Sequence, residues 1–273
     1  MQYSIPDLLD CAVGAATAAG RHALDNSQRR KDALSITRHD IKLKLDVECQ
    51  NVAVGMIHSR YPGAVVLGEE DQPTDRAHSD GVSANSEWSE LEWVIDPIDG
   101  TVNFYHGLPL WCCSIAARKA GKSLVGVVFA PELDVLYTAT IATPSTANDK
   151  PIHVSDTSTI ADALFLTSLN QKLDTDLSAN DVLMHISGKV RKTRVLGAAA
   201  LDICRVAQGQ ADAYWEPGNY TWDVAAAGLI VRQAGGTAGA LHMHQEPHRM
   251  SYLATNGLLY EEFSRILSDF IQP

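Results

Sequence analysis

The sequence lacks most features that would place it in a specialised class of protein. Its five cysteines form no Cys-x-x-Cys pair and no zinc-site spacing, and Cys112 and Cys113 are adjacent. This usage predicts reduced thiols in a cytoplasmic protein. No apolar run approaches the length of a membrane span, so no membrane contact is expected. The N-terminus also lacks a basic segment, which argues against a signal peptide.

Basic charge is scarce as well. There are 22 Lys and Arg residues against 33 Asp and Glu residues, giving a formal net charge of −11. This balance disfavours direct binding to nucleic acid. Internal repeats and low-complexity tracts are absent. The remaining composition is ordinary for a globular protein, and 273 residues suffice for one large domain or two modest ones that share a core.

The most informative stretch runs from residue 92 to 104. The apolar run from Trp93 to Ile95 is typical of a buried strand, and Pro97 cannot pair in a central ladder. Asp96 and Asp99 therefore lie where a strand opens into a tight turn, and Gly100 permits that turn. Carboxylate oxygens packed this closely suit a hard divalent cation such as Mg²⁺.

Two other interpretations apply to the same residues. Asp-Pro and Asp-Gly are ordinary turn-forming pairs, and either alone indicates a turn rather than a site. An Asp-x-Asp-Gly-Thr motif would indicate a phosphatase with a carboxylate nucleophile. That motif is excluded because the residue two positions before Asp99 is Pro97.

Residues 96–104, Asp-Pro-Ile-Asp-Gly-Thr-Val-Asn-Phe, resemble the first signature of the inositol monophosphatase family. Gly-Glu-Glu at 68–70 and Trp-Asp-Val-Ala-Ala at 222–226 match further family blocks in order and rough spacing. The resemblance implies an α+β fold, a layered αβαβα sandwich. It also implies an N-terminal part (1–145) with an antiparallel sheet and most metal ligands. A C-terminal α/β part (146–273) would carry the substrate-binding turn and the last ligand.

The resemblance further implies a Mg²⁺-dependent, Li⁺-sensitive phosphomonoesterase that uses two or three ions. The implied metal ligands are Glu69, Asp96, the backbone carbonyl of Ile98, Asp99 and Asp223, with Asp46 as a candidate outer ligand. Glu70 and Thr101 would be catalytic, positioning a water molecule and accepting its proton. The implied substrate contacts are Gly100, Thr101, Gly197, Ala199 and Glu216.

Three of these assignments have structural alternatives. Asp46 and Asp223 can each serve as a helix cap. Around Asp46 the chain departs from the family, because Leu43 and Lys44 replace the usual Val-Thr pair. The small residues of 197–200 open a helix whose free amides can hold an anion, or they serve helix packing alone.

The implied substrate is inositol monophosphate or a related small polyol or sugar phosphate. Similar frameworks act on 3′-phosphoadenosine nucleotides, fructose bisphosphate and histidinol phosphate, which remain alternatives. A regulatory binding protein that retains the metal site is the non-enzyme alternative. Family members are commonly homodimers, so a homodimer is expected.

Hydrophobic periodicity predicts the elements in chain order. Helices are expected at 5–20, 47–60, 179–187, 197–208, 222–234 and 258–270. Strands are expected at 38–46, 64–67, 93–95, 112–117, 125–129, 135–140, 164–167, 192–196, 211–215 and 252–255. Residues 71–89 read as a polar surface loop, and residues 143–150 as a polar connection between the two parts.

Overall fold

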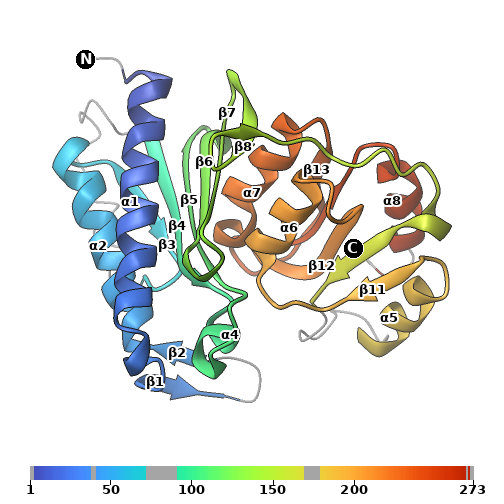
Figure 1. Cartoon of the computed structure of the whole chain (residues 1–273), viewed down its shortest axis with the longest axis horizontal. Helices are drawn as coiled ribbons and strands as arrows, with labels where there is room; N and C mark the ends of the chain where they lie inside the picture. Colours follow the sequence, from blue (N-terminus) through green and yellow to red (C-terminus); the bar gives the residue numbers. More distant parts are fainter. Residues whose placement is uncertain (1–2, 38–40, 72–90, 169–178, 269, 271–273) are drawn as a thin grey trace.

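A computed structural model of the chain describes residues 3–37, 41–71, 91–168, 179–268 and 270. Its elements stack in the order helices, sheet, helices, sheet, helices, as Figure 1 shows. The predicted αβαβα sandwich is therefore confirmed. The predicted surface loop at 71–89 lies almost wholly outside the described residues.

The first sheet contains seven strands in the described part of the chain, in the order β3-β4-β5-β6-β7-β8-β9. Only β3 and β4 are parallel, and the later neighbours pair antiparallel. The strands are β3 (Val65–Gly68), β4 (Leu91–Asp99), β5 (Cys112–Lys119), β6 (Lys122–Ala130), β7 (Val135–Thr140), β8 (Thr143–Ala147) and β9 (Lys150–Pro151), with a short 3-10 helix, η2 (Pro131–Leu133), before β7.

The polar connection predicted at 143–150 is wrong, because β8 and β9 extend the sheet there. The polar side chains of β8 are accommodated by hydrogen bonds. Ser145 donates its hydroxyl to the carbonyl of Ile230 at 2.6 Å, and Thr146 bonds to Thr138. The first sheet thus continues to Pro151, while the division of the chain at residue 145 stays a prediction.

Two helices cover the outer face of this sheet, α1 (Ile5–Asp25) and α2 (Lys44–Arg60). The Ser4 hydroxyl caps α1 by accepting from the amide of Asp7, as the sequence predicts. A small hairpin of β1 (Ala33–Ile36) and β2 (Ile41–Leu43) joins the helices. The strand predicted at 38–46 is therefore too long. The chain turns into α2 at Lys44, where the Asp46 carboxylate accepts from the amide of Leu43.

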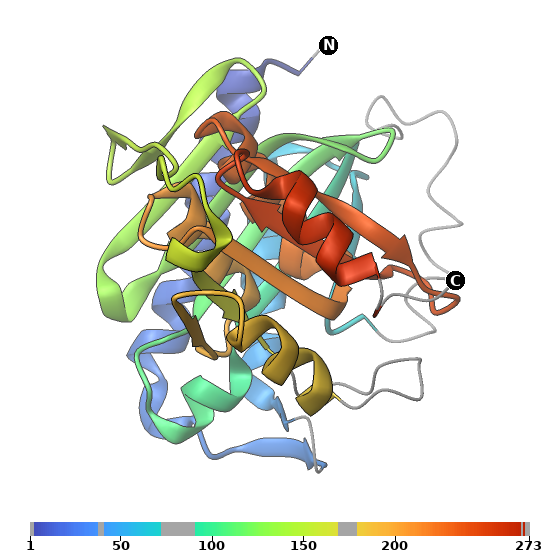
Figure 2. The ribbon, with the colours of Figure 1, turned by 90° about the vertical axis from the view of Figure 1, so that its right-hand side faces the viewer.

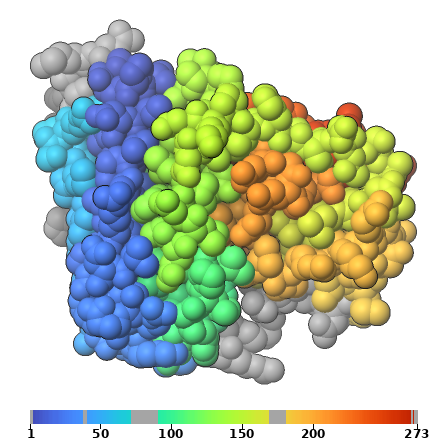
Figure 3. Space-filling model, viewed as in Figure 1, coloured from blue at the N-terminus to red at the C-terminus, as the bar shows by residue number. Residues whose placement is uncertain are grey.

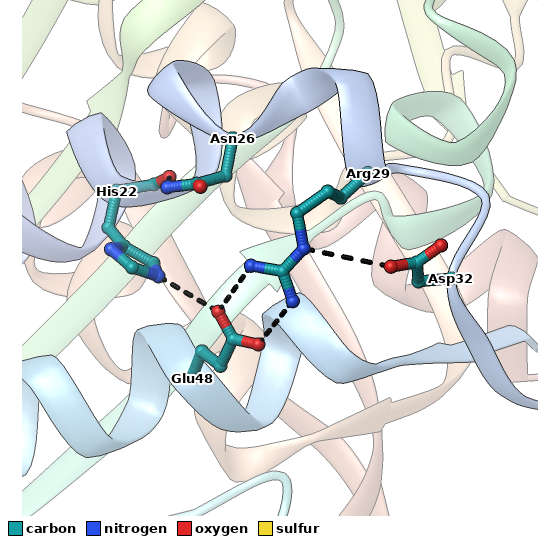
Figure 4. A network of polar contacts seen from close by, with 5 residues as sticks. All are labelled: His22, Asn26, Arg29, Asp32 and Glu48. Carbon is teal, nitrogen blue, oxygen red and sulfur yellow. Dashed lines mark hydrogen bonds and ion pairs between the residues drawn. The ribbon is translucent and has the colours of Figure 1, made fainter.

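A polar network ties the end of α1 and the following 3-10 turn, η1 (Ser27–Arg29), to α2 (Figure 4). The Arg29 guanidinium donates to both oxygens of Glu48, at 2.6 and 3.0 Å. His22 approaches the same carboxylate at 3.1 Å, and Asn26 donates to the His22 carbonyl. Hydrogen bonds from Arg29 and then His22 lower the pKa of Glu48 to about 2.

We expect Glu48→Gln to lower the free energy of unfolding at pH 7 by about 1 kcal/mol or less, because the pair is about one-third exposed. A carboxylate with a depressed pKa stabilises the fold above its unfolded pKa and loses this effect as the pH falls through its folded pKa. The difference from wild type should therefore shrink between about pH 4.5 and pH 2. Urea unfolding at pH 7 and pH 3.5 measures it, with exposed Glu132→Gln as the control. An equal loss at both pH values would contradict the electrostatic explanation.

The second sheet has five strands among the described residues, in the order β11-β10-β12-β14-β13. They are β10 (Leu164–Thr167), β11 (Lys192–Arg194), β12 (Ala213–Tyr220), β13 (Thr237–Met243) and β14 (Arg249–Thr255). Strand β12 runs past its predicted end, because Pro217 and Gly218 lie in an irregular step between Glu216 and Asn219 rather than ending the ladder.

Helices α6 (Ala199–Ala207) and α7 (Thr221–Gln233) fill the space between the two sheets. Helices α5 (Ala179–Ser187) and α8 (Tyr260–Ser268) cover the outer face of the second sheet, as Figure 2 shows, beside a short 3-10 helix, η3 (Ile160–Asp162). In Figure 3 the blue-to-green N-terminal elements and the orange C-terminal elements occupy opposite sides of the molecule.

All five cysteines belong to the described residues, and each is buried and free of disulfides. Among those residues, no helix combines the length and apolar character needed to cross a bilayer.

Candidate active site

A cavity of about 330 Å³ lies where α4 (Thr101–His106) meets the elements of the second sheet. Its wall contains every predicted metal ligand except Asp46 and every predicted substrate contact. The lining residues are Glu69, Asp96, Ile98, Asp99, Gly100, Thr101, Val102, Asn103, Ser168, Val195, Leu196, Gly197, Ala199, Glu216 and Asp223. Segments that are far apart in the sequence thus meet at one cavity.

The turn after β4 places the first two acids. The strand pairing with β5 becomes irregular between Asp96 and Asp99, so β4 ends at Asp99 instead of at Asp96. Gly100 then adopts φ +89°, a conformation that other residues rarely adopt. The Thr101 hydroxyl donates to the carbonyl of Ile98 at 3.0 Å, which closes the turn.

Asp99 also joins the two halves of the molecule. Its carboxylate accepts from the amides of Ala199 at 2.9 Å and Ala200 at 2.8 Å, at the start of α6. The prediction of free amides at this helix start is therefore wrong, because Asp99 itself is the anion they hold. Asn103 adds a second link by donating to the carbonyls of Leu110 and Leu196, both at 2.8 Å.

Asp46 and Asp223 occupy equivalent positions in the first turns of α2 and α7. One carboxylate oxygen of Asp46 accepts from the amide of Leu43, and one of Asp223 accepts from the amide of Tyr220, each at 2.7 Å. Neither residue is the N-cap itself, because Leu43 and Tyr220 hold that position; each aspartate instead bonds back from the third helical position to the N-cap amide. Ligation of a metal is compatible with this bond, because a carboxylate has two oxygens and about four acceptor sites.

Burial and mutual repulsion make these acids hard to ionise together. Burial, followed by the charges of neighbouring carboxylates, raises the pKa of Glu69, Asp96 and Asp223 well above the usual range. Burial also raises the pKa of Asp99 to about 6, although hydrogen bonds from Cys112 and the α6 amides oppose it. A bound cation would relieve this repulsion and favour the ionised forms.

The donor chemistry fits a hard cation. The cavity presents carboxylate oxygens and the Ile98 carbonyl, which are the ligands that Mg²⁺ prefers. In the part of the chain that the structure describes, no three acidic, histidine or cysteine side chains form a ready-made metal cage. The case for a Mg²⁺ site therefore rests on the chemical type of the donor atoms, on their burial and on the cavity that they share.

Glu216 lines the same cavity and is linked to Asp223 through Asn219, whose amide donates to both carboxylates. Burial raises the pKa of Glu216 to about 7, while hydrogen bonds from the Tyr214 hydroxyl at 2.7 Å and the Asn219 amide at 3.2 Å oppose this rise. Ser168 also bonds to this carboxyl group and lines the cavity, and sequence reasoning missed it. The available signal was its position directly after the apolar strand at 164–167.

Glu70 does not line the cavity, although its charge acts on the neighbouring Glu69, which does. The Glu70 side chain is buried, its amide donates to the Gln50 side chain at 3.0 Å, and its carboxylate lies 3.4 Å from the Lys42 ammonium. Lys42 was not singled out from the sequence, although it is next to the altered Leu43 and Lys44 pair.

Comparisons with known proteins show which family the chain resembles. The model of the inositol monophosphatase family matches residues 6–269. The chain is 33% identical over 242 residues to an inositol monophosphatase of Mesembryanthemum crystallinum, covering 86% of this chain and 87% of the relative. It is also 33% identical over 232 residues to the Nus factor SuhB of Pasteurella multocida, covering 84% and 83%. The solved inositol monophosphatase of Anabaena superposes with a TM-score of 0.79 at 30% identity, over 98% of this chain and 97% of that one.

Proposed function

Because the chain belongs to the inositol monophosphatase family, we propose that it is a Mg²⁺-dependent phosphomonoesterase acting on inositol monophosphate or a related small polyol phosphate. The observation that carries this proposal is the convergence of Glu69, Asp96, Asp99 and Asp223 on one cavity that also holds Glu216. Burying four carboxylates in one poorly solvated wall costs folding free energy unless a cation binds them. A bound cation would also attract a phosphate group, despite the formal net charge of −11.

The four acids and the Ile98 carbonyl would hold the metal ions. Bound Mg²⁺ supplies a water of lowered pKa and neutralises charge on the phosphate and the leaving oxygen. Thr101 donates its only hydroxyl hydrogen to Ile98, so its oxygen is oriented to accept one from the attacking water. Glu70 would take the proton of that water. No covalent phosphoenzyme is needed.

Glu216 would select the substrate. The hydrogen bonds from Tyr214 and Asn219 fix its carboxyl group in the cavity, where a substrate hydroxyl can donate to it. Gly197 and Ala199 also line the cavity, and the amides near Gly100 and Thr101 would lie beside the phosphate. A cavity of about 330 Å³ is at the small end of ligand pockets, which favours a single-ring polyol over a nucleotide.

We expect Glu216→Gln to lower kcat/KM for inositol 1-phosphate by about 10- to 100-fold, because a buried charge-assisted hydrogen bond contributes roughly 1.5–3 kcal/mol. Hydrolysis of p-nitrophenyl phosphate, which has no hydroxyl to donate, should change far less. Steady-state kinetics with both esters separate the two effects. An equal loss on both would mean that Glu216 supports the fold or the metal site and not the substrate hydroxyl.

The substrate class is tested with a panel of phosphate esters. We would measure phosphate release from inositol 1-phosphate, fructose 1,6-bisphosphate, histidinol phosphate and 3′-phosphoadenosine 5′-phosphate, each with Mg²⁺, with EDTA and with added Li⁺. The expected result is Mg²⁺-dependent, Li⁺-sensitive release that is fastest with inositol 1-phosphate. A faster rate with another ester would assign the protein to the corresponding branch.

A second candidate function follows from the Pasteurella relative named a Nus factor. The chain would then also, or instead, bind a protein partner. Absence of turnover across the panel with Mg²⁺ demonstrably bound, together with co-purification of transcription factors, would favour this function over catalysis.

A further inference from the structure

A lysine, Lys42, contacts one of the acidic residues next to the candidate site. The Lys42 ammonium lies 3.4 Å from one carboxylate oxygen of Glu70. The Glu70 side chain is 5% exposed and that of Lys42 is 43% exposed, so the ammonium reaches from the surface to a buried carboxylate. Such a partner offsets the cost of burying the Glu70 charge.

The fold fixes the direction of this lysine. Side chains alternate between the two faces of a strand, and Leu43 of β2 is fully buried in the core between α1, α2 and the first sheet. Lys42 therefore lies on the opposite face, toward Glu70. The backbone of Glu70 is itself anchored, because its amide donates to Gln50 at 3.0 Å.

The contact leaves little room for a divalent cation on Glu70. A cation bound to the same carboxylate would lie within a few ångströms of the ammonium, and like charges repel strongly at that distance in a poorly solvated site. One oxygen of Asp46, the candidate outer ligand, is also engaged by the amide of Leu43. That contact leaves the second oxygen of Asp46 for a metal, but an outer ion there would have no help from Glu70, because Lys42 engages the Glu70 carboxylate.

We propose that the Lys42 ammonium takes the place of an outermost divalent cation and positions Glu70, so that this protein uses two metal ions rather than three. The inference rests on the proposed function, since it concerns the same acidic site. Sequence reasoning placed the departure from the family at Leu43 and Lys44. The structure assigns its consequence to Lys42, because Leu43 is in the core and Lys44 is exposed.

The chain provides a matched control. Lys42→Met and Lys44→Met remove the same charge two residues apart, and only the first removes the contact with Glu70. Bound Mn²⁺, a paramagnetic substitute for Mg²⁺, would be counted by equilibrium dialysis and electron paramagnetic resonance in wild type and both variants. Thermal unfolding would verify that each is folded, and Lys42→Gln serves if the methionine variant is not.

We expect two bound ions in wild type and in Lys44→Met, and a third, weaker ion in Lys42→Met. Phosphate release by Lys42→Met should fall at least about 10-fold at the Mg²⁺ concentration that saturates wild type, and should recover as Mg²⁺ is raised further. Three ions in wild type, or two in Lys42→Met, would overturn the inference while Mg²⁺-dependent hydrolysis by wild type still supported the proposed function. Failure of wild type to bind ions or hydrolyse any ester would overturn the proposed function itself.

Discussion

Asp96→Asn is expected to lower kcat for phosphate release by about 1,000-fold or more, the scale of losing a group that stabilises transition-state charge. Asp96 is 2% exposed on the wall of the acidic cavity, where an amide cannot replace a carboxylate as a ligand for a hard cation. The same substitution should stabilise the metal-free fold. Burial and the charges of Glu69, Asp99 and Asp223 raise the pKa of Asp96, so the folded state is penalised once the pH exceeds the unfolded pKa.

The sign of this effect fixes its pH dependence. A raised carboxyl pKa costs stability as the pH rises from about 4 toward the folded pKa, and costs nothing below about pH 4. In EDTA, the Tm of Asp96→Asn should exceed that of wild type at pH 7.5, and the difference should vanish near pH 4. Added Mg²⁺ should raise the Tm of wild type but hardly that of the variant. Asp149→Asn makes the same change at an exposed turn and should match wild type in every assay. An active Asp96→Asn protein would disprove the assigned site.

Gly100→Ala should lower kcat/KM by about 100-fold, because displacement of reacting groups by about 1 Å has effects of this size. An added Cβ would lie 2.9 Å from the Leu110 carbonyl and 3.0 Å from the Ala198 Cβ, so the turn must move. Asp99 and Thr101, on either side of this residue, would move with it. Strain at φ +89° adds a stability loss of about 1–3 kcal/mol.

Gly121→Ala separates these two effects. Gly121 has φ +74°, and an added Cβ there would meet no atom within 4 Å. This variant carries the backbone strain alone and should retain nearly full activity. Urea unfolding and steady-state kinetics on both variants provide the comparison. Equal kinetics for the two would mean that the shape of the Gly100 turn does not control the site.

Local signals in the sequence predicted most elements correctly. Ser4 caps α1 as expected, and the three segments predicted as strands between residues 112 and 140 form an antiparallel meander. Strand β8 was missed because its polar residues, Thr143, Ser145 and Thr146, read as a connection. Hydrogen bonds to other strands and to α7 satisfy several of these groups, and such partners are not visible in a local window.

The residues that line the cavity were predictable as a set, but their arrangement was not. Asp96, Asp99 and Asp223 follow from the signatures, and the cavity brings them together. That Asp99 caps a helix one hundred positions away depends on how the two halves pack. The contact between Lys42 and Glu70 depends on the register of β2 and on where α2 begins. The sequence pattern predicted a strand that continues too far, to residue 46. Contacts of this kind arise from tertiary structure, which composition and spacing do not encode locally.

The most direct test titrates Mg²⁺ into metal-free protein and follows ion binding by calorimetry and phosphate release from inositol 1-phosphate on the same sample. The expected result is no release in EDTA, and release that rises as two ions fill the site formed by Glu69, Asp96, Asp99 and Asp223. Phosphate release that persists in EDTA would contradict it, as would full occupancy by Mg²⁺ with no release of phosphate.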